Sequence, residues 1–423
     1  MQLHKYLPLP SDRMGTLWAL TSIKDACIIE YGPAGTTHYG IEGFMQLNAE
    51  LRAKLYTTHM DETNIVMGDC ERLEETIKEV DAVYNPPVIF VLASTISSII
   101  GADIENICEN IQNEVKAKLV PFSGGGLRGD YTLGIKEVLT SLAMDVVKEP
   151  TEKLPKTYNI IGCNIDQYNF ASDLKELEGL MEAYFGYKLH AVFSGNSSIQ
   201  EIQEASKAEF NIVLRGEGIK CAEVLKEKFQ MDYYFGAPYG FKGTINWLKG
   251  IEKSFSLKGN DLFLGRQMEK SRRLIMRMKQ STFTIKQFRG ILSGNFDFVM
   301  DIYPFLMDEL SINLTKLIVN HSGKDISHRN VVETMKEKLI FNPSEEAKED
   351  LLLKEEPQII FGDGILLEMG KEVSMMIQVS NPNLHQIQIF EGTPFMGFNG
   401  AIYLIEVLLN QISHNRKNLK SKF

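Results

Sequence analysis

Short apolar runs alternate along the chain with longer stretches in which apolar residues recur at helical spacing. The first run, Ala26 to Ile29, is followed by a glycine-containing turn and then by Phe44, Leu47 and Leu51 at helical spacing. Such alternation predicts buried strands that are each followed by a helix. The other predicted strands are residues 54–57, 88–92, 118–122, 158–162, 190–193, 210–214, 233–235, 290–294, 314–319, 358–361, 375–378 and 386–389.

The stretches between these strands predict the helices, and residues that cap helices, such as Asp69 and Ser94, begin some of them. A basic run from Arg266 to Met278 predicts a long exposed helix whose charges are solvated, which we favour over a nucleic-acid site. The predicted helices are residues 13–22, 36–51, 69–80, 94–107, 131–147, 172–185, 218–229, 296–310, 331–339 and 395–412, with others beginning at Phe241 and within 252–285.

The strand–helix pattern restarts twice, which predicts an α/β protein with three regions of parallel sheet covered by helices. Residues 149–155 have the composition of a linker. The loops that follow parallel strands lie at one edge of each sheet, so we expect them to converge on a central cleft. We predict an N-terminal α/β domain with an interface turn at 1–150, a second at 151–251, a bridging helical segment at 252–285 and a third domain at 286–423.

Composition limits the classes of function. The chain has 423 residues, enough for several domains, and its net charge of −10 disfavours a general nucleic-acid binder. No apolar stretch approaches the roughly 20 residues of a membrane span, and residues 1–10 lack the apolar core of a secretory signal. The five dispersed cysteines form no CxxC pair, which is typical of a reducing cytoplasm.

The turn after the first strand is a candidate binding element. Gly32 and Gly35 let backbone approach a bound group, and Thr36 begins a helix whose free N–H groups point at the turn. Two glycines in such a turn also have a purely steric explanation, so the turn alone does not decide between a binding and a structural role.

Segments spread over nearly the whole chain resemble the nitrogenase component 1 proteins. Their order and spacing carry the resemblance more than any one of them does. The matching segments are Lys24-Asp25, 32–35, 61–68, 88–104 with Thr95 and the turn Ile99–Asp103, 194–198, Phe235-Gly236, Tyr239-Gly240 and 393–400.

The resemblance implies three Rossmann-like domains around a central cleft, in a homodimeric or α2β2-type assembly. It implies electrons delivered by an ATP-dependent iron protein through an iron–sulfur cluster between subunits. It also places Gly32, Gly35 and Thr36 beside the cluster, and Gly101 and Asp103 where the iron protein docks.

This chain departs from the family pattern at the cluster ligands. The cysteines expected in the N-terminal arm, after the glycine turn and after the central strand correspond to Ser11, Thr36 and Thr95. A neutral hydroxyl is a poor iron ligand beside a thiolate. The cofactor histidine of nitrogenase corresponds to about Met396, which we interpret as a core residue.

The remaining cysteines do not replace this set. Cys70 is the one weak candidate for a metal ligand, and no family ligand position matches Asp25, Glu30 or Asp61 as an oxygen donor. We therefore expect no cofactor in this chain alone. A cysteine-bearing homologous partner would hold most of any iron–sulfur cluster, and no nucleic acid or membrane is expected as a partner.

Three functions remain open at this point. The first is a ligand-poor, beta-like subunit of a nitrogenase-like oxidoreductase acting on a small or tetrapyrrole-like substrate, with His38, Arg215 and Met396 as cleft candidates. The second is a non-catalytic scaffold for assembling a metallocofactor. The third, a metal-free sugar- or nucleotide-binding protein, ranks last because no GxGxxG or Walker pattern is present.

Overall fold

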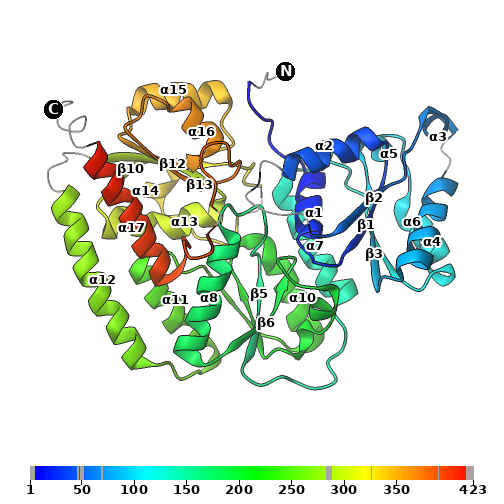
Figure 1. Cartoon of the computed structure of the whole chain (residues 1–423), viewed down its shortest axis with the longest axis horizontal. Coiled ribbons are helices and arrows are strands. Elements are labelled where there is room, and N and C mark those ends of the chain that lie inside the picture. Colours follow the sequence, from blue (N-terminus) through cyan, green and yellow to red (C-terminus); the bar gives the residue numbers. More distant parts are fainter. Residues whose placement is uncertain are drawn as a thin grey trace.

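Three parallel β-sheets organise the molecule, as seen in a computed structural model of the chain (Figure 1). The structure describes residues 5–44, 47, 52–67, 70–282, 288–324, 326–388 and 390–415. Each sheet is flanked by helices, as expected when strands are connected through helical crossovers. The α/β class and parallel sheets predicted from the sequence are confirmed.

The first sheet has the strand order β2-β1-β3-β4. Its two central strands, β1 (Cys27–Tyr31) and β3 (Val88–Ala93), are buried along their whole length, which explains why Glu30 is the one charged residue in either strand. The outer strands are β2 (Lys54–Thr57) and β4 (Lys118–Phe122). The helices are α1 (Asp12–Thr21), α2 (Ala34–Phe44), α3 (Glu62–Met67), α4 (Glu71–Tyr84), α5 (Thr95–Ile99), α6 (Ile104–Ile111) and α7 (Tyr131–Ser141), with a π-helical turn at Leu142–Val146.

Helices α1 and α7 approach each other closely because a glycine stands on each at the crossing. A Cβ on Gly15 of α1 would lie 1.9 Å from the carbonyl oxygen of Tyr131, and one on Gly134 of α7 would lie 1.9 Å from that of Asp12. This packing fixes the starts of both helices, and the predicted site residue Ser11 lies directly before α1.

The second sheet has the order β6-β5-β7-β8, with the apolar strands β5 (Thr157–Ile161) and β7 (Phe210–Val213) in the middle. Strands β6 (Lys188–Phe193) and β8 (Tyr233–Phe235) form its edges. Its helices are α8 (Phe170–Phe185), α9 (Ile199–Gln203), α10 (Ile219–Phe229) and α11 (Gly240–Phe255).

The third sheet has the order β11-β10-β9-β12-β13. Its strands are β9 (Arg289–Gly294), β10 (Asn313–Val319), β11 (Leu339–Phe341), β12 (Ile359–Asp363) and β13 (Met375–Ser380). Its helices are α13 (Phe296–Pro304), α14 (Glu333–Lys336), α15 (Glu345–Glu355) and α16 (Gly364–Met369).

Two predictions in this region are wrong. Residues 331–339 do not form one helix, because α14 ends at Lys336 and Leu339 already begins the edge strand β11. Residues 386–388 form no strand, since the backbone N–H of Gln386 is bonded to the side chain of Gln378 instead of a neighbouring strand. The last residue of that predicted strand, Ile389, lies outside the described residues.

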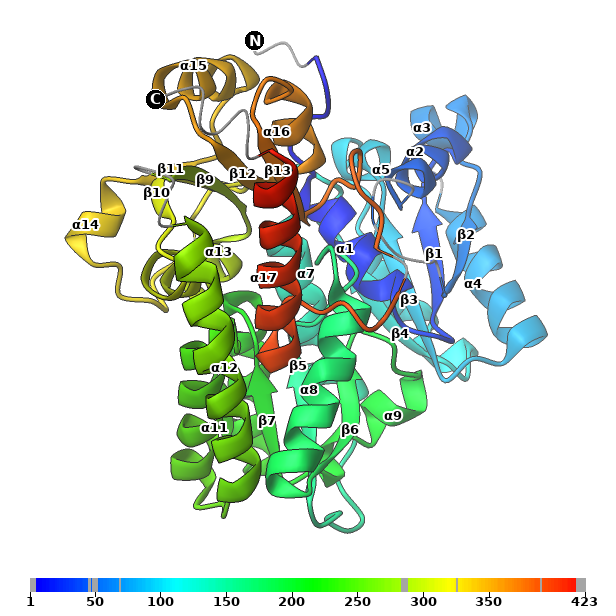
Figure 2. The same cartoon turned by 60° about the vertical axis from the view of Figure 1, so that its left-hand side comes forward.

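The last helix returns to the second sheet region. Helix α17 (Gly397–His414) packs against α8, α11 and α12 (Asp261–Thr282). Helix α12 is the long basic helix predicted from the sequence, and it lies side by side with α17 (Figures 1 and 2). The side chains of α12 that are buried in this packing are spaced seven residues apart: Leu264, Ser271 and Met278. The domain limits given above stay a prediction. None of the described helices is both long enough and apolar enough to cross a bilayer.

Candidate functional site

The residues at the predicted cluster-ligand positions gather at the carboxyl edge of the first sheet. Ser11 precedes α1, Thr36 lies in the first turn of α2, and Thr95 begins α5 directly after β3. The loop after β4 joins them, since a Cβ on Gly126 would lie 3.0 Å from Ser11 Oγ and 3.4 Å from Thr95 Oγ1. The fold therefore brings Ser11 and Thr95 to one place although 84 positions separate them in the sequence.

The threonine hydroxyls at this edge bond to the protein's own backbone. Thr95 Oγ1 donates to the carbonyl of Gly125 at 2.7 Å, and Thr36 Oγ1 donates to that of Pro33 at 2.8 Å. A hydroxyl used in this way presents neither charge nor soft sulfur to iron. The three residues at the ligand positions do not fit an iron–sulfur cluster.

A buried ion pair lies behind the turn. Arg13 of α1 donates through Nε to Glu30 Oε1 of β1 at 2.5 Å and through Nη2 to the carbonyl oxygen of Thr36 at 3.0 Å. Glu30 is fully buried and also accepts from the Thr37 hydroxyl at 2.6 Å. This network holds β1, α1 and α2 together and leaves Glu30 unavailable as an oxygen ligand.

The five cysteines do not supply the missing ligands. Burial raises the pKa of Cys108 to about 12 and raises the pKa of Cys27, Cys163 and Cys221, which disfavours the thiolate that binds iron. Cys70 is partly buried before α4, where its sulfur lies 3.8 Å from the Tyr31 hydroxyl. Within the described ranges, no three His, Cys, Asp or Glu side chains are placed to share a metal ion.

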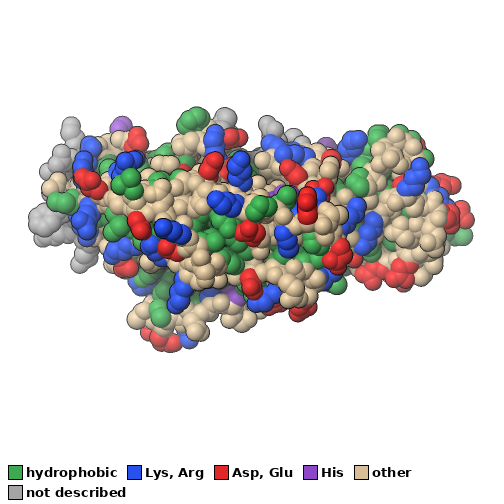
Figure 3. Space-filling view, turned by 90° about the horizontal axis from the view of Figure 1, so that it is seen from below, with side chains coloured by type: hydrophobic (Ala, Val, Ile, Leu, Met, Phe, Trp, Pro, Cys, Tyr) green, Lys and Arg blue, Asp and Glu red, His purple; other side chains and the backbone are tan. Residues whose placement is uncertain are grey.

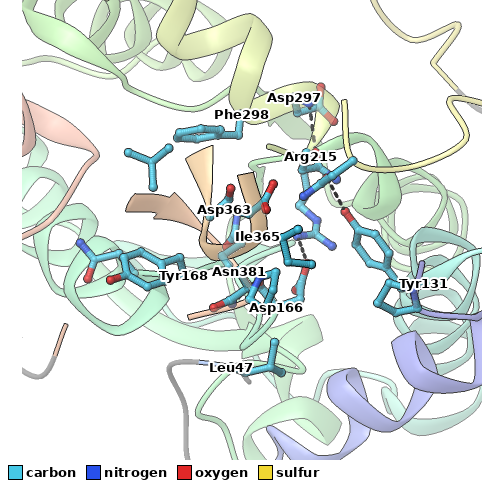
Figure 4. Close-up of a pocket in the computed structure, with 18 of the residues that line it drawn as sticks. Leu47, Tyr131, Asp166, Tyr168, Arg215, Asp297, Phe298, Asp363, Ile365 and Asn381 are labelled. Carbon is cyan, nitrogen blue, oxygen red and sulfur yellow. Dashed lines mark hydrogen bonds and ion pairs between the residues drawn. The ribbon is translucent and has the colours of Figure 1, made fainter. Parts of the chain in front are cut away.

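A cavity of about 410 Å³ lies where the three sheet regions meet (Figure 4). Among the described residues, neither cysteine nor histidine lines it. Its wall comes from the N-terminal arm, the first sheet region, the carboxyl ends of the other two sheets, and the segment before α17. The lining includes Leu7–Pro10, Trp18, Leu47, Tyr131, Asp166–Asn169, Asp173, Leu214, Arg215, Tyr239, Asn295, Asp297, Phe298, Asp301, Asn342–Glu345, Lys348, Asp363, Ile365, Val379–Pro382, Phe395 and Met396.

One corner of the cavity is formed by a buried charge cluster. Arg215, 2% exposed at the end of β7, donates to Asp166 at 2.6 Å, and its Nε lies 3.2 Å from Glu217 (Figure 4). The two carboxylates raise the pKa of Arg215 against the lowering effect of burial, while burial raises the pKa of Asp166. Gly162 makes room, because a Cβ there would lie 2.9 Å from Arg215 Cγ.

A second charge cluster forms the wall on the side of the third sheet. Arg329 makes a bidentate pair with Asp301 at 2.7 Å for each bond and also contacts Asp297, which accepts from His328 at 2.9 Å. Burial raises the pKa of Asp301 to about 6, whereas His328 and Arg329 hold the pKa of Asp297 below its ordinary value despite burial. These carboxylates are therefore already paired within the protein.

Apolar and aromatic side chains complete the cavity. Phe298 and Tyr239 meet edge to face with centroids 5.4 Å apart, and Tyr168 stacks on Phe395 at 6.1 Å. Ile365 and Leu47 add aliphatic surface (Figure 4), as do residues 7–10 of the N-terminal arm. A cavity with two charge clusters in its wall and apolar surface between them suits an organic ligand, or a preassembled metal cofactor that the protein holds without thiolates.

Asp173 ties the cavity to the start of α17. Its Oδ1 accepts the backbone N–H groups of Phe395 at 2.6 Å and Met396 at 2.8 Å. Burial raises the pKa of Asp173 to about 7, although both of these bonds favour the carboxylate. The folded state therefore keeps this proton at a pH where the unfolded chain releases it.

We expect Asp173 to make stability fall as pH rises between its unfolded and folded pKa values. Between pH 5 and pH 7 the loss amounts to about 2 kcal/mol, because unfolding releases a proton over this range. Asp173→Asn retains an accepting oxygen and removes the titration. Denaturation midpoints of both proteins from pH 5 to 8 measure the difference in slope, and equal slopes would contradict this account.

The structure places the predicted site residues in different surroundings. Arg215 and Met396 line the cavity, whereas His38 is 74% exposed on α2, outside the cavity, and pairs with Glu42. Gly101 and Asp103 lie in the turn between α5 and α6, where the Asp103 side chain caps α6. Asp166 and residues 7–10 were not among the predicted site residues. The position of Asp166 shortly after a buried strand was the signal that could have identified it.

The comparisons with known proteins identify the family. The profile of the nitrogenase component 1 type oxidoreductases matches residues 11–413. The chain belongs to this family. The resemblance predicted from the sequence is confirmed. Family members bind iron–sulfur clusters and form hetero-oligomers with homologous subunits and an ATP-dependent iron protein.

Individual relatives carry different names. The chain is 27% identical over 291 residues to the nitrogenase iron-molybdenum cofactor biosynthesis protein NifE of Methanococcus maripaludis, covering 66% of this chain and 57% of that protein. It is 21% identical over 431 residues to a subunit of the light-independent protochlorophyllide reductase of Leptolyngbya boryana, covering 98% and 84%. The solved structure "Nitrogenase Cp1 at pH 6.5" shares the fold, with a TM-score of 0.80, 14% identity, and coverage of 99% and 96%.

Proposed function

We propose that this chain is the ligand-poor, beta-like subunit of a heteromeric nitrogenase-like oxidoreductase. In this proposal a homologous, cysteine-bearing partner holds most of any iron–sulfur cluster, and an ATP-dependent iron protein supplies electrons. This chain contributes the interface turn around Gly32, Gly35, Thr36, Ser11 and Thr95, and a cavity for a small or tetrapyrrole-like substrate.

The proposal depends on a contrast between the family fold of the chain and the side chains at its predicted cluster-ligand positions. The chain has the fold of the family, but the hydroxyls of Thr36 and Thr95 are bonded to the carbonyls of Pro33 and Gly125 of the same chain. A dimer of two such chains would offer an iron–sulfur cluster almost no thiolates. A cluster at this interface would therefore need its ligands from a different subunit.

The charge of the surface supports docking of a basic partner near Gly101 and Asp103. Residues 61–114 contain twelve acidic and two basic residues. Acidic side chains gather at the end of the molecule formed by the first sheet region (Figure 3, right). Such a surface steers a partner with a positively charged face, which is how we propose that the iron protein approaches.

A scaffold role in metallocofactor assembly is the second candidate. Several relatives, including those from Methanococcus maripaludis and Clostridium pasteurianum, are named as the cofactor biosynthesis protein NifE. A cavity lined by neither cysteine nor histidine among the described residues suits a scaffold, because a ligand held without a metal bond is released more readily. In that role the chain has no catalytic residues.

The test is the distribution of iron between the chain alone and its complex. The chain is purified anaerobically by itself and together with its homologous partner subunit, and iron content and visible absorption are recorded. We expect iron only in the complex, and unchanged iron in a complex carrying Cys70→Ser. A brown homodimer with a stoichiometric cluster would contradict the proposal. An iron-free complex that binds a cofactor precursor would favour the scaffold.

A further inference from the structure

The N-terminal arm, residues 5–10, runs between the first and third sheet regions before α1 begins (Figures 1 and 2). Leu7, Pro8, Leu9 and Pro10 line the cavity, yet Pro8 is exposed to solvent and Leu7 and Leu9 are only partly buried. The arm is thus a single chain thick between the cavity and solvent. It forms an outer wall of the cavity.

The tip of the arm, Lys5 and Tyr6, is bonded to a side chain from the third sheet region. Glu345, in the first turn of α15, accepts the backbone N–H of Lys5 at 2.7 Å and that of Tyr6 at 3.1 Å. Both bonds end on an ionised carboxylate, which makes them stronger than bonds between neutral groups. Glu345 and the two amides therefore act as a latch.

The foot of the arm is anchored differently. Tyr131 donates its backbone N–H to the carbonyl of Pro10 at 2.9 Å, and Asp12 donates to that of Gly129 at 3.0 Å. Between foot and tip, Pro8 and Pro10 have no amide hydrogen, and the described structure gives the amides of Leu7 and Leu9 no hydrogen-bond partner. The segment can therefore move about its foot when the latch opens, at the cost of few contacts.

We propose that residues 5–10 form a strap that closes the cavity, and that release of Lys5 and Tyr6 from Glu345 opens it for ligand exchange. The proposal rests on the proposed function only in treating the cavity as a binding site. The strap contributes aliphatic side chains and prolines, while Arg215 and Asp166 form a charged corner of the same cavity. The ligand therefore has an apolar face toward the strap and a polar edge elsewhere.

The test measures how fast a thiol inside the cavity reacts. Ser380→Cys is nearly isosteric and places a thiol among the lining residues, where Ser380 is 9% exposed. N-ethylmaleimide modification is followed by peptide mass spectrometry in this background, with and without Glu345→Ala. Glu346→Ala is the matched control, since it removes the neighbouring carboxylate from the same helical turn. Cys70 in each sample reports general reactivity.

We expect Glu345→Ala to accelerate labelling at position 380 by about 10- to 100-fold, as loss of two charge-assisted bonds would. Glu346→Ala and the labelling of Cys70 should stay unchanged. Hydrogen exchange at Lys5 and Tyr6 should also lose protection in Glu345→Ala. Ile365→Cys provides a second reporter if Ser380→Cys does not fold.

Equal labelling rates in Glu345→Ala and Glu346→Ala would overturn the strap, as would rapid labelling with the latch intact. The experiment uses the chain without partner, iron or substrate. A negative result in this experiment would therefore not contradict the proposed subunit function. Conversely, an iron-containing homodimer would contradict the proposed function but not the strap.

Discussion

Replacing Arg13 with methionine is expected to lower the free energy of unfolding by about 3–5 kcal/mol. Arg13 is 6% exposed and its partner Glu30 is fully buried, so the substitution leaves an unpaired carboxylate in the core. It also removes the bond that fixes the carbonyl of Thr36 in the interface turn. Denaturant titration measures the loss, and hydrogen exchange along β1 locates it in the first sheet region.

The double variant Arg13→Met/Glu30→Gln tests the cause of that loss. A neutral glutamine still accepts from the Thr37 hydroxyl and leaves no buried charge, so we expect it to recover about half of the lost stability or more. If the double variant is no more stable than Arg13→Met, loss of packing by the arginine side chain explains the effect better than the unpaired charge does.

Replacing Arg215 with methionine is expected to cost a similar amount, about 3–5 kcal/mol at neutral pH. Asp166 and Glu217, with side chains 5% and 9% exposed, would both lose their cation. Burial already raises the pKa of Asp166 against the opposing effect of Arg215, so the variant should raise this pKa further. A folded pKa above the unfolded value means that stability falls as pH rises through the interval between them.

The pH dependence separates this explanation from a simple packing defect. Arg215→Met should be less destabilised near pH 4–5 than at pH 8, because the buried carboxyl is then protonated in the folded state. Arg215→Met/Asp166→Asn should recover stability at pH 8 and show a weaker pH dependence. A destabilisation that is the same at both pH values would show that the lost charge is not its source.

Strands buried on both faces were the most predictable part of the fold. Residues 88–92 are an unbroken apolar run and residues 210–214 are interrupted only by Asn211, and the structure has strands there because both faces of a parallel sheet are covered. Residues 386–389 carry an alternating pattern as well. Residues 386–388 do not form a strand, because the side chain of Gln378 accepts the backbone N–H of Gln386. The local sequence pattern does not indicate that contact.

The candidate site was predictable in part. The family resemblance predicted Ser11, Thr36 and Thr95 as interface residues, which stays a prediction, and the structure brings Ser11 and Thr95 together against Gly126. Contacts between distant segments were not predictable. Asn381 donates to the carbonyl of Asp166 at 2.9 Å across 215 positions, and Glu345 accepts from Lys5 across 340. Such pairs arise from how the sheet regions are assembled, which spacing along one segment does not encode.

The return of α17 to the second sheet region sets the order in which the chain can be completed during synthesis. Helices α8 and α11 bury part of their apolar surface against Leu404, Ile405 and Leu408, which the ribosome makes more than 140 residues after α11 ends. Until then this surface stays uncovered on the nascent chain, and it is the kind of surface on which incomplete chains aggregate. The core of the second sheet region is therefore completed late, although its own strands are synthesised early.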